Sequence, residues 1–149
     1  MTQSLQNLLL DSVRVSIGNV IPKSLDQAEV STSNEPLSKD EIGVSINFTN
    51  SEYCMILDGQ RVVFSRMSEA IFGMYMEGDM LDSCVSEIAN IIAGGTTTIL
   101  GEQGVSLDIT PPSLLQDNFH GNDTSNKLML PISIETVGDI RVVLLKEQE

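Results

Sequence analysis

The chain has few positive charges and no tryptophan, and long apolar runs are absent from it. It has 149 residues, of which 8 are Lys or Arg and 21 are Asp or Glu, so its formal net charge is -13. A surface this acidic repels phosphate backbones and anionic headgroups, which excludes nucleic acid and anionic membranes as partners. No apolar run approaches the roughly 20 residues of a membrane span, and nothing resembles a secretory leader. We therefore expect a cytoplasmic protein.

Histidine and cysteine are also scarce. Cys54 and Cys84 lack CxxC spacing, so in a reducing compartment we expect two small buried side chains rather than a disulfide or a metal site. His120 is the only histidine, and no second His or Cys lies near it to complete a metal site or a nucleophile-base pair. The sequence therefore predicts no metal or cofactor of its own, and a surface-loop position for His120.

What remains is enough for one globular domain over residues 1–149. With 41% hydrophobic residues, a chain of this length can bury roughly two thirds of its unfolded surface. Apolar residues recur at helical spacing in three segments, with Asp58 and Asp79 as N-caps of the second and third. We expect core positions for the methionines of the second helix and its end, Met67, Met74, Met76 and Met80. The predicted helices cover 4–20, 60–76 and 79–100.

Alternating apolar and polar residues predict about six strands, two pairs of which form hairpins. Pro131 cannot donate a backbone hydrogen bond, so we expect it at a sheet edge or bulge. Helices grouped beside sequence-adjacent strand pairs predict an α+β fold, a mostly antiparallel sheet covered by helices on one face. The residues 113–126, which include His120, form a polar loop. The predicted strands cover 27–32, 42–48, 53–57, 105–110, 127–136 and 139–146.

The third helix is the most informative segment. Its apolar residues gather on one side, while Ser83, Glu87, Asn90 and Gly94 form a narrow stripe on the other. A solvated helix face usually carries interspersed Lys and Glu, whereas this stripe has one carboxylate, one carboxamide and small residues. Such a helix lets another surface come close. The apolar side consists of Leu81, Val85, Ile88, Ile92, Gly95 and Ile99.

The stripe resembles the signature of the CheC/CheX/FliY chemotaxis phosphatases. That signature has Ser or Asp, three residues, Glu, two residues and Asn, followed some twenty residues later by a proline. Ser83, Glu87, Asn90 and Pro112 match it here. The resemblance covers essentially the whole chain and suits the short, single-site CheX branch. Gly95 departs from the pattern, because an Asn is common at that place.

The resemblance implies a CheX-like fold and a phosphatase that acts on the aspartyl phosphate of a CheY-like response regulator. It implies that Asn90 orients the attacking water and that Glu87 pairs with a lysine of the regulator. Ser83, Gly94 and Pro112 would contact the partner, and the Mg²⁺ would belong to the regulator. The Glu-Asn pair has no nucleophile, no histidine, no second carboxylate at glycosidase spacing and no metal cluster beside it, so the partner must complete the active site.

Two other functions stay open at this point. A module that binds a receiver domain, or docks in a flagellar or signalling complex without catalysis, needs the same stripe. An enzyme of another kind would have to use the 113–126 loop and His120. Neither the partner regulator nor the motility pathway is identified by the sequence.

Two further expectations concern the rest of the chain. CheX-type relatives pair through their sheets, and the edge of the terminal hairpin would otherwise be exposed, so we expect a homodimer. The first helix carries a faint echo of the motif in Ser12, Ser16 and Asn19, without the acid. Leucines on the same side as Ser12 indicate that this face is packed, and we predict no site there.

Overall fold

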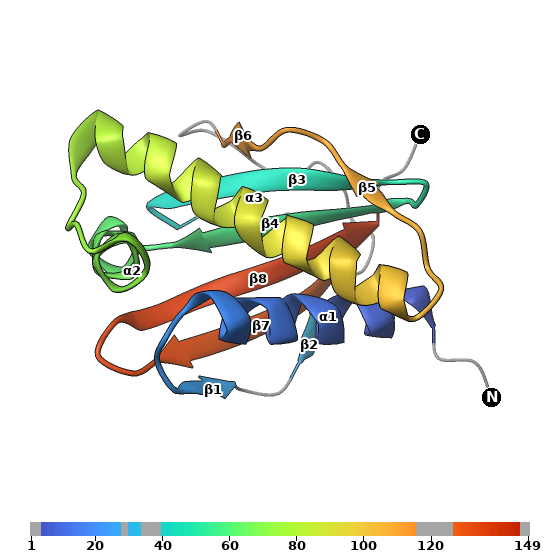
Figure 1. Cartoon of the computed structure of the whole chain (residues 1–149). Helices are drawn as coiled ribbons and strands as arrows, with labels where there is room; N and C mark the ends of the chain where they lie inside the picture. The colour runs from blue at the N-terminus through green and yellow to red at the C-terminus, as the bar shows by residue number, and fades with distance from the viewer. Residues whose placement is uncertain (1–3, 28–29, 34–39, 116–126, 147–149) are drawn as a thin grey trace.

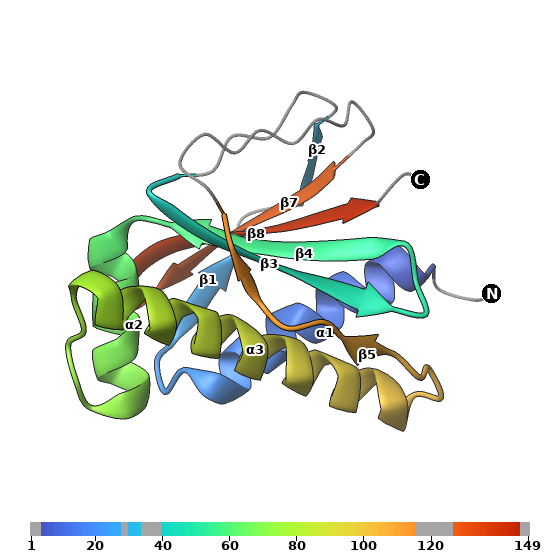
Figure 2. The same ribbon diagram turned by 90° about the horizontal axis from the view of Figure 1, so that it is seen from above.

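Three helices cover one face of an antiparallel sheet (Figure 1), and the same layering is visible from above (Figure 2). The computed structural model describes residues 4–27, 30–33, 40–115 and 127–146. The helices are α1 (Leu5–Val20), α2 (Arg61–Phe72) and α3 (Gly78–Glu102). The strands are β1 (Leu25–Gln27), β2 (Ser31–Ser33), β3 (Ile42–Thr49), β4 (Tyr53–Gly59), β5 (Asp108–Ile109), β6 (Ser113–Leu114), β7 (Lys127–Ile134) and β8 (Gly138–Lys146). The predicted α+β class is confirmed.

The strand order is β1-β7-β8-β4-β3-β5, with β2 also paired to β7 and β6 also paired to β3. Both predicted hairpins, β3-β4 and β7-β8, are present, and β4 pairs with β8 to join them. Asn50 turns the first hairpin with a φ of 65°, and Thr136 lies in the turn of the second with a φ of 63°. The centre of the sheet therefore joins the middle of the chain to its end.

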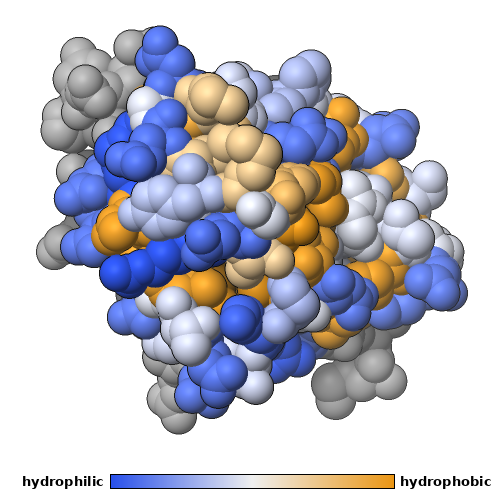
Figure 3. All heavy atoms as spheres, turned by 60° about the vertical axis from the view of Figure 1, so that its left-hand side comes forward, coloured by the Kyte–Doolittle hydropathy of each residue, from blue (hydrophilic) through white to orange (hydrophobic). Residues whose placement is uncertain are grey.

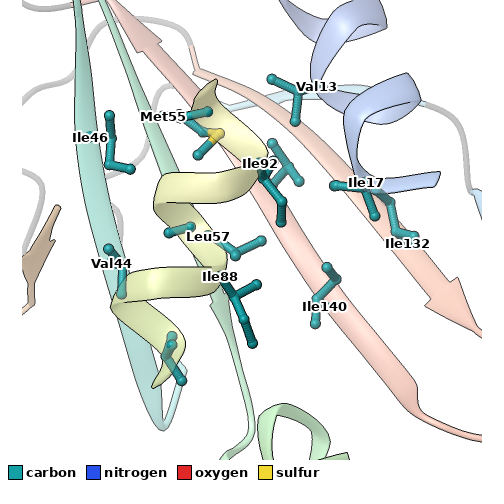
Figure 4. Close-up of a cluster of buried hydrophobic side chains, with 14 of the residues drawn as sticks. Val13, Ile17, Val44, Ile46, Met55, Leu57, Ile88, Ile92, Ile132 and Ile140 are labelled. Carbon is teal, nitrogen blue, oxygen red and sulfur yellow. The ribbon is translucent and has the colours of Figure 1, made fainter. Parts of the chain in front are cut away.

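The core lies between the sheet and the helices. Alternate residues of each strand face the helices, as in β3, where Val44, Ile46 and Phe48 are buried. Figure 4 shows Ile88 and Ile92 of α3 pointing toward the sheet. A smaller cluster on the opposite face of the sheet contains Cys54, Ile56 and Val143. Both cysteines are buried, and neither is part of a disulfide.

Helix α1 begins and ends where the sequence predicts. Ser4 is its N-cap, and the Ser4 hydroxyl accepts a hydrogen bond from the Asn7 amide at 3.3 Å. Ser12 and Ser16 are buried, so the packed face expected for the echo of the motif is confirmed at these two positions, while Asn19 is exposed. The echo therefore does not form a second copy of the outward-facing stripe.

The predicted cap at Asp58 is wrong. Asp58 is a β4 residue with 0% exposure, and its carboxylate accepts two hydrogen bonds from Arg141, from Nε at 2.9 Å and from Nη2 at 2.5 Å. The amide of Asp40 donates a third bond at 3.1 Å. A buried carboxylate needs a cation and several donors, and this demand outweighs a helix cap. The hydrogen bond to Asp58 raises the pKa of Arg141, which stays charged. The N-cap of α2 is instead Gln60, whose side chain makes no cap hydrogen bond.

The junction between α2 and α3 also differs from the prediction. Helix α2 ends at Phe72 rather than Met76, because Gly73 adopts a left-handed conformation with a φ of 80°. Glu77, not Asp79, is the N-cap of α3, and Asp79 lies in the first turn, where a carboxylate favours the helix dipole. Met67 is a core residue as expected and Met76 is partly buried, but Met74 and Met80 are 56% and 62% exposed.

The predicted strand 105–110 is reduced to β5, which pairs with the end of β3. The predicted edge strand 27–32 is two short strands, β1 and β2, both paired with β7. Pro131 pairs with β8 and lies between the residues of β7 that pair with β1 and those that pair with β2. Because β7 is flanked on both sides, the expected position at the sheet edge is wrong.

Strands β1 and β2 pair with β7 and so cover the edge of the terminal hairpin. An exposed edge there was one reason to expect a homodimer, so the homodimer stays a prediction without that support. His120 and the residues 116–126 lie outside the described part of the chain. No helix in that described part has the length and apolar character needed to cross a bilayer.

The Asp58-Arg141 pair yields a stability prediction. Arg141→Ala leaves the buried Asp58 carboxylate without its cation, which we expect to lower the free energy of unfolding by about 3 kcal/mol. Lys146→Ala is the matched control. Lys146 lies on β8, as Arg141 does, and pairs with Glu52, but this pair is exposed. Urea denaturation followed by circular dichroism measures both variants. Equal stability of the two variants would contradict this role of the buried pair.

Candidate functional site

Helix α3 presents the predicted stripe to solvent. Ser83 and Glu87 are exposed, and Asn90 and Gly94 are half-buried. The side chains at the same levels on the other side of the helix are buried, including Val85, which is 0% exposed. Since side chains three or four positions apart lie on one helix face, burial of one side fixes the stripe outward.

The stripe forms one wall of a groove of about 390 Å³. The structure brings Ser83, Glu87, Asn90 and Pro112 together in this groove, although Pro112 lies more than twenty residues further along the chain. Gly94 is on the stripe but is not among the residues that line the groove. The complete lining is Ser83, Ser86, Glu87, Asn90, Ile109, Thr110, Pro111 and Pro112.

The second wall of the groove is fixed to the sheet. The Thr110 amide donates to the Asn47 carbonyl at 3.0 Å, and the Asn47 amide donates to the Thr110 hydroxyl at 3.0 Å. On either side of the two prolines, β5 and β6 pair with β3. The position of Pro112 relative to α3 is therefore set by backbone hydrogen bonds to β3.

The two longest polar side chains of the stripe make no polar contact within the described fold. Within the described residues, neither the Glu87 carboxylate nor the Asn90 carboxamide has a hydrogen-bond or ion-pair partner. Neighbouring hydroxyls are engaged: Ser86 donates to the Asp82 carbonyl at 3.2 Å, and Thr97 donates to the Gly94 carbonyl at 2.8 Å. A carboxylate and a carboxamide, one helical turn apart, are thus available to another molecule.

Cys84 lies one turn before Glu87 but faces inward. Its side chain is buried, and burial, with a smaller contribution from the Glu87 carboxylate, raises the pKa of the Cys84 thiol. At neutral pH it stays protonated, so it is not a nucleophile for the groove. The groove lining itself contains no His, Cys, Lys or Arg.

Gly94 and Gly95 have opposite surroundings. A Cβ at Gly94 would meet no atom within 4 Å, so the protein's own packing does not require glycine there. A Cβ at Gly95 would collide with the hydroxyl of Ser16, which donates to the Ile92 carbonyl at 2.7 Å. The departure from the family pattern at Gly95 therefore lies where α1 packs closely on α3.

Four lining residues were missed by the sequence analysis: Ser86, Ile109, Thr110 and Pro111. Ser86 precedes Asn90 by one turn, and its place beside the stripe could have been found from helical spacing. The other three depend on how the segment after α3 docks on β3, which helical periodicity does not show.

Two other grooves have a similar volume, about 400 Å³ each. In one of them the guanidinium of Arg141 is already held by Asp58. The other lies near Arg66, which donates to the Val137 carbonyl at 3.4 Å. Among the described residues, no three His, Cys, Asp or Glu side chains cluster in a way that could hold a metal ion.

Comparison with known protein families shows to which family the chain is related. The family model described as chemotaxis phosphatase CheX matches residues 42–133, which is more than half of the chain and includes the stripe and Pro112. This chain belongs to the CheX family. No curated protein matches it significantly.

Several solved structures similar to the chain carry CheX or CheC names. A CheC-like superfamily protein from Shewanella sp. PV-4 has a TM-score of 0.76 at 17% identity, covering 99% of this chain and 100% of that one. A CheX-CheY-BeF3-Mg²⁺ complex from Borrelia burgdorferi gives 0.76 at 19% identity, covering 97% and 99%. CheX from Desulfovibrio desulfuricans gives 0.73 at 15%, covering 95% and 97%. These similarities establish the CheX-like fold.

The two glycines give a paired prediction within this CheX fold. Gly94→Ala should raise the free energy of unfolding by about 0.5–1 kcal/mol, because alanine favours a helix and the site has room. Gly95→Ala should lower it by roughly 1 kcal/mol, because Ser16 must give up its buried hydrogen bond. Adding Ser16→Ala to Gly95→Ala should recover part of that loss. Thermal and urea denaturation test the signs, and equal shifts for both single variants would be evidence against the close contact.

Proposed function

We propose that the protein is a phosphatase that hydrolyses the aspartyl phosphate of a CheY-like receiver domain, with α3 inserted at the phosphorylated site. The observation that carries this proposal is the pair Glu87 and Asn90, which project from α3 with no partner in the described chain. Membership of the CheX family supports the reaction class. The solved complex of a CheX with CheY, BeF3 and Mg²⁺ supports the kind of partner.

Hydrolysis of an acyl phosphate needs little from the phosphatase itself. The acyl phosphate is already activated, so in-line placement of water and stabilisation of charge are the main requirements. Asn90 suits this task, because its amide oxygen accepts a hydrogen bond from the water while its NH₂ donates to a phosphoryl oxygen. A carboxamide does not take up a proton at neutral pH, so Asn90 positions the water and is not a base.

Glu87 has a different role. A carboxylate beside a phosphate is repelled unless a cation lies opposite, and we assign that cation to a lysine of the receiver domain. This charge-assisted contact places the two proteins in register and brings Asn90, one turn further along α3, to the phosphate. The exposure of Glu87 and its freedom from ion pairs within the described residues fit this role.

The remaining site residues shape the approach. Gly94 has no side chain, and open space beyond it leaves room for the surface of the partner. Pro112 borders the groove opposite Glu87, and Ser83 lies one turn before Glu87 as a supporting contact. The Mg²⁺ that neutralises the phosphate belongs to the receiver domain.

Asn90→Ala tests catalysis separately from binding. The amide acts only in the transition state, so turnover should fall roughly 100-fold or more while binding to the phosphorylated receiver persists. Release of phosphate from a panel of phosphorylated receiver domains measures the turnover. Asn19→Ala is the matched control, because Asn19 is an exposed helical asparagine in the echo of the motif on α1. Wild-type turnover by Asn90→Ala would refute the assignment.

Glu87→Ala should weaken both binding and turnover, with a loss of about 1–3 kcal/mol in affinity, because it removes one half of a charge-assisted contact. Glu87→Lys should be worse, since it opposes a cation with a cation. Isothermal titration measures the affinity. The free energy of unfolding should change by under about 0.5 kcal/mol, because the Glu87 side chain is exposed. Glu102→Ala, an exposed acid at the end of the same helix, is the control. Binding that is unchanged in Glu87→Lys would contradict the proposed contact.

The adaptor alternative is separated from catalysis by the same assays. A wild-type protein that binds a phosphorylated receiver domain tightly but never accelerates phosphate loss would be a binding module. Our proposal requires turnover above the rate at which the receiver domain loses its phosphate alone.

A further inference from the structure

Exposed apolar side chains are concentrated at one end of α3. Eight large hydrophobic residues in the described chain are well exposed, and five of them lie between the start of α2 and the first turn of α3. Figure 3 shows this side of the molecule, where hydrophobic surface forms a broken band among polar groups. We refer to these five residues as the apolar corner: Val62, Phe72, Met74, Tyr75 and Met80.

Met80 joins the apolar corner to the stripe. It lies seven residues before Glu87, two helical turns away on the same face of α3, and it is 62% exposed. Ile91, one turn after Glu87, is half-buried on the same side. The available carboxylate therefore stands between two apolar side chains along the helix.

The corner is held in place by hydroxyl groups. The Ser65 hydroxyl donates to the Met76 carbonyl at 2.6 Å, and the Ser68 hydroxyl donates to the Met74 carbonyl at 2.9 Å. The Met76 amide donates to the Ser68 hydroxyl at 3.0 Å. Both serines are buried, so the backbone that carries Met74 and Tyr75 is fixed with these side chains exposed. Fixed apolar side chains lose little conformational entropy on binding.

The size of a typical protein interface indicates that a partner must contact more than the groove and its stripe. A specific complex typically buries about 800 Å² on each partner, contributed by 20–30 residues, and the groove with its stripe supplies fewer residues than that. Toward the C-terminus the stripe continues into Thr98, Gly101 and Glu102, which are polar or lack a side chain. Toward the N-terminus it meets Met80 and the apolar corner. Desolvating the apolar side is favourable, whereas burying Glu102 is not.

Charge limits the kind of partner. Glu77 and Asp79 are exposed beside the apolar corner, and Arg61 is engaged with Asp82 at 2.8 Å and with the Gly78 carbonyl at 3.2 Å. A partner with an acidic surface would be repelled here. A partner that presents a lysine flanked by apolar residues fits both Glu87 and Met80.

We propose that the apolar corner is the second half of the docking surface for the receiver domain, with Met80 and Tyr75 as its apolar anchors. This inference rests on the proposed function. Glu87 and Asn90 then act at the phosphate, while the corner contributes affinity for the body of the receiver domain. Apolar anchors beside a polar contact are the usual arrangement of binding energy at interfaces.

The test uses the receiver domain whose phosphate the wild-type chain removes fastest, loaded with Mg²⁺ and beryllofluoride in place of the phosphate. Met80→Ser and Tyr75→Ser should each raise its Kd about tenfold and raise KM for the phosphorylated domain, with kcat unchanged. Val15→Ser is the matched control, because Val15 is a 46% exposed apolar residue on α1, away from the stripe. Its Kd should stay within twofold of the wild type.

Each outcome has one meaning. If wild type binds and dephosphorylates a receiver domain but Met80→Ser and Tyr75→Ser bind it as Val15→Ser does, this inference is wrong and the proposed function stands. If the two variants bind the receiver domain as the wild type does but have a different oligomeric mass in light scattering, the corner joins two copies of this chain and the inference is overturned. If wild type neither binds nor dephosphorylates any receiver domain, the proposed function fails, and this inference fails with it.

Discussion

The packing of α3 on the sheet is the contact on which the rest of the site depends. Ile88 and Ile92 are 0% exposed and point toward the sheet in Figure 4. Because successive helical residues are about 100° apart, fixing these two inward fixes Glu87 and Asn90 outward. A helix rotated by one residue would bury the Glu87 carboxylate, at a cost of several kcal/mol without a partner cation. The hydrophobic core thus orients the polar pair.

Contacts on both flanks hold α3 in that orientation. On one side the Ser16 hydroxyl of α1 reaches the Ile92 carbonyl, and the lack of a side chain at Gly95 lets the helices come close. On the other side the segment that bears Pro112 is tied to β3 through Asn47 and Thr110. The groove is therefore built by segments far apart in the sequence, and no local motif could form it alone.

Strong local periodicity explains why much of this fold could be predicted. The 25 residues of α3 and the alternating residues of β3 each carry the pattern of the face that they bury, so both elements were found with nearly correct bounds. The stripe with Glu87 and Asn90 follows from the same periodicity, and its position beside Pro112 was expected only from the family resemblance.

The wrong predictions at Asp58 and Met80 both relied on residue type. Asp58 has the residue type of a helix cap, but its partner Arg141 is 83 residues away, and the pairing of β4 with β8 brings them together. Met80 has a residue type that usually packs in a core, but it lies two turns before Glu87 on the outward face of α3 and is 62% exposed. The role of Asp58 therefore depends on a long-range contact, whereas the exposure of Met80 follows from its position on the helix rather than from its residue type.

A structure of the complex with a receiver domain that carries Mg²⁺ and beryllofluoride tests the central claim most directly. The Asn90 carboxamide should lie at hydrogen-bond distance from the position of the attacking water, in line with the bond from beryllium to the aspartyl oxygen, and Glu87 should contact a lysine of the partner. A receiver domain bound elsewhere, with the groove between α3 and Pro112 open to solvent, would contradict it.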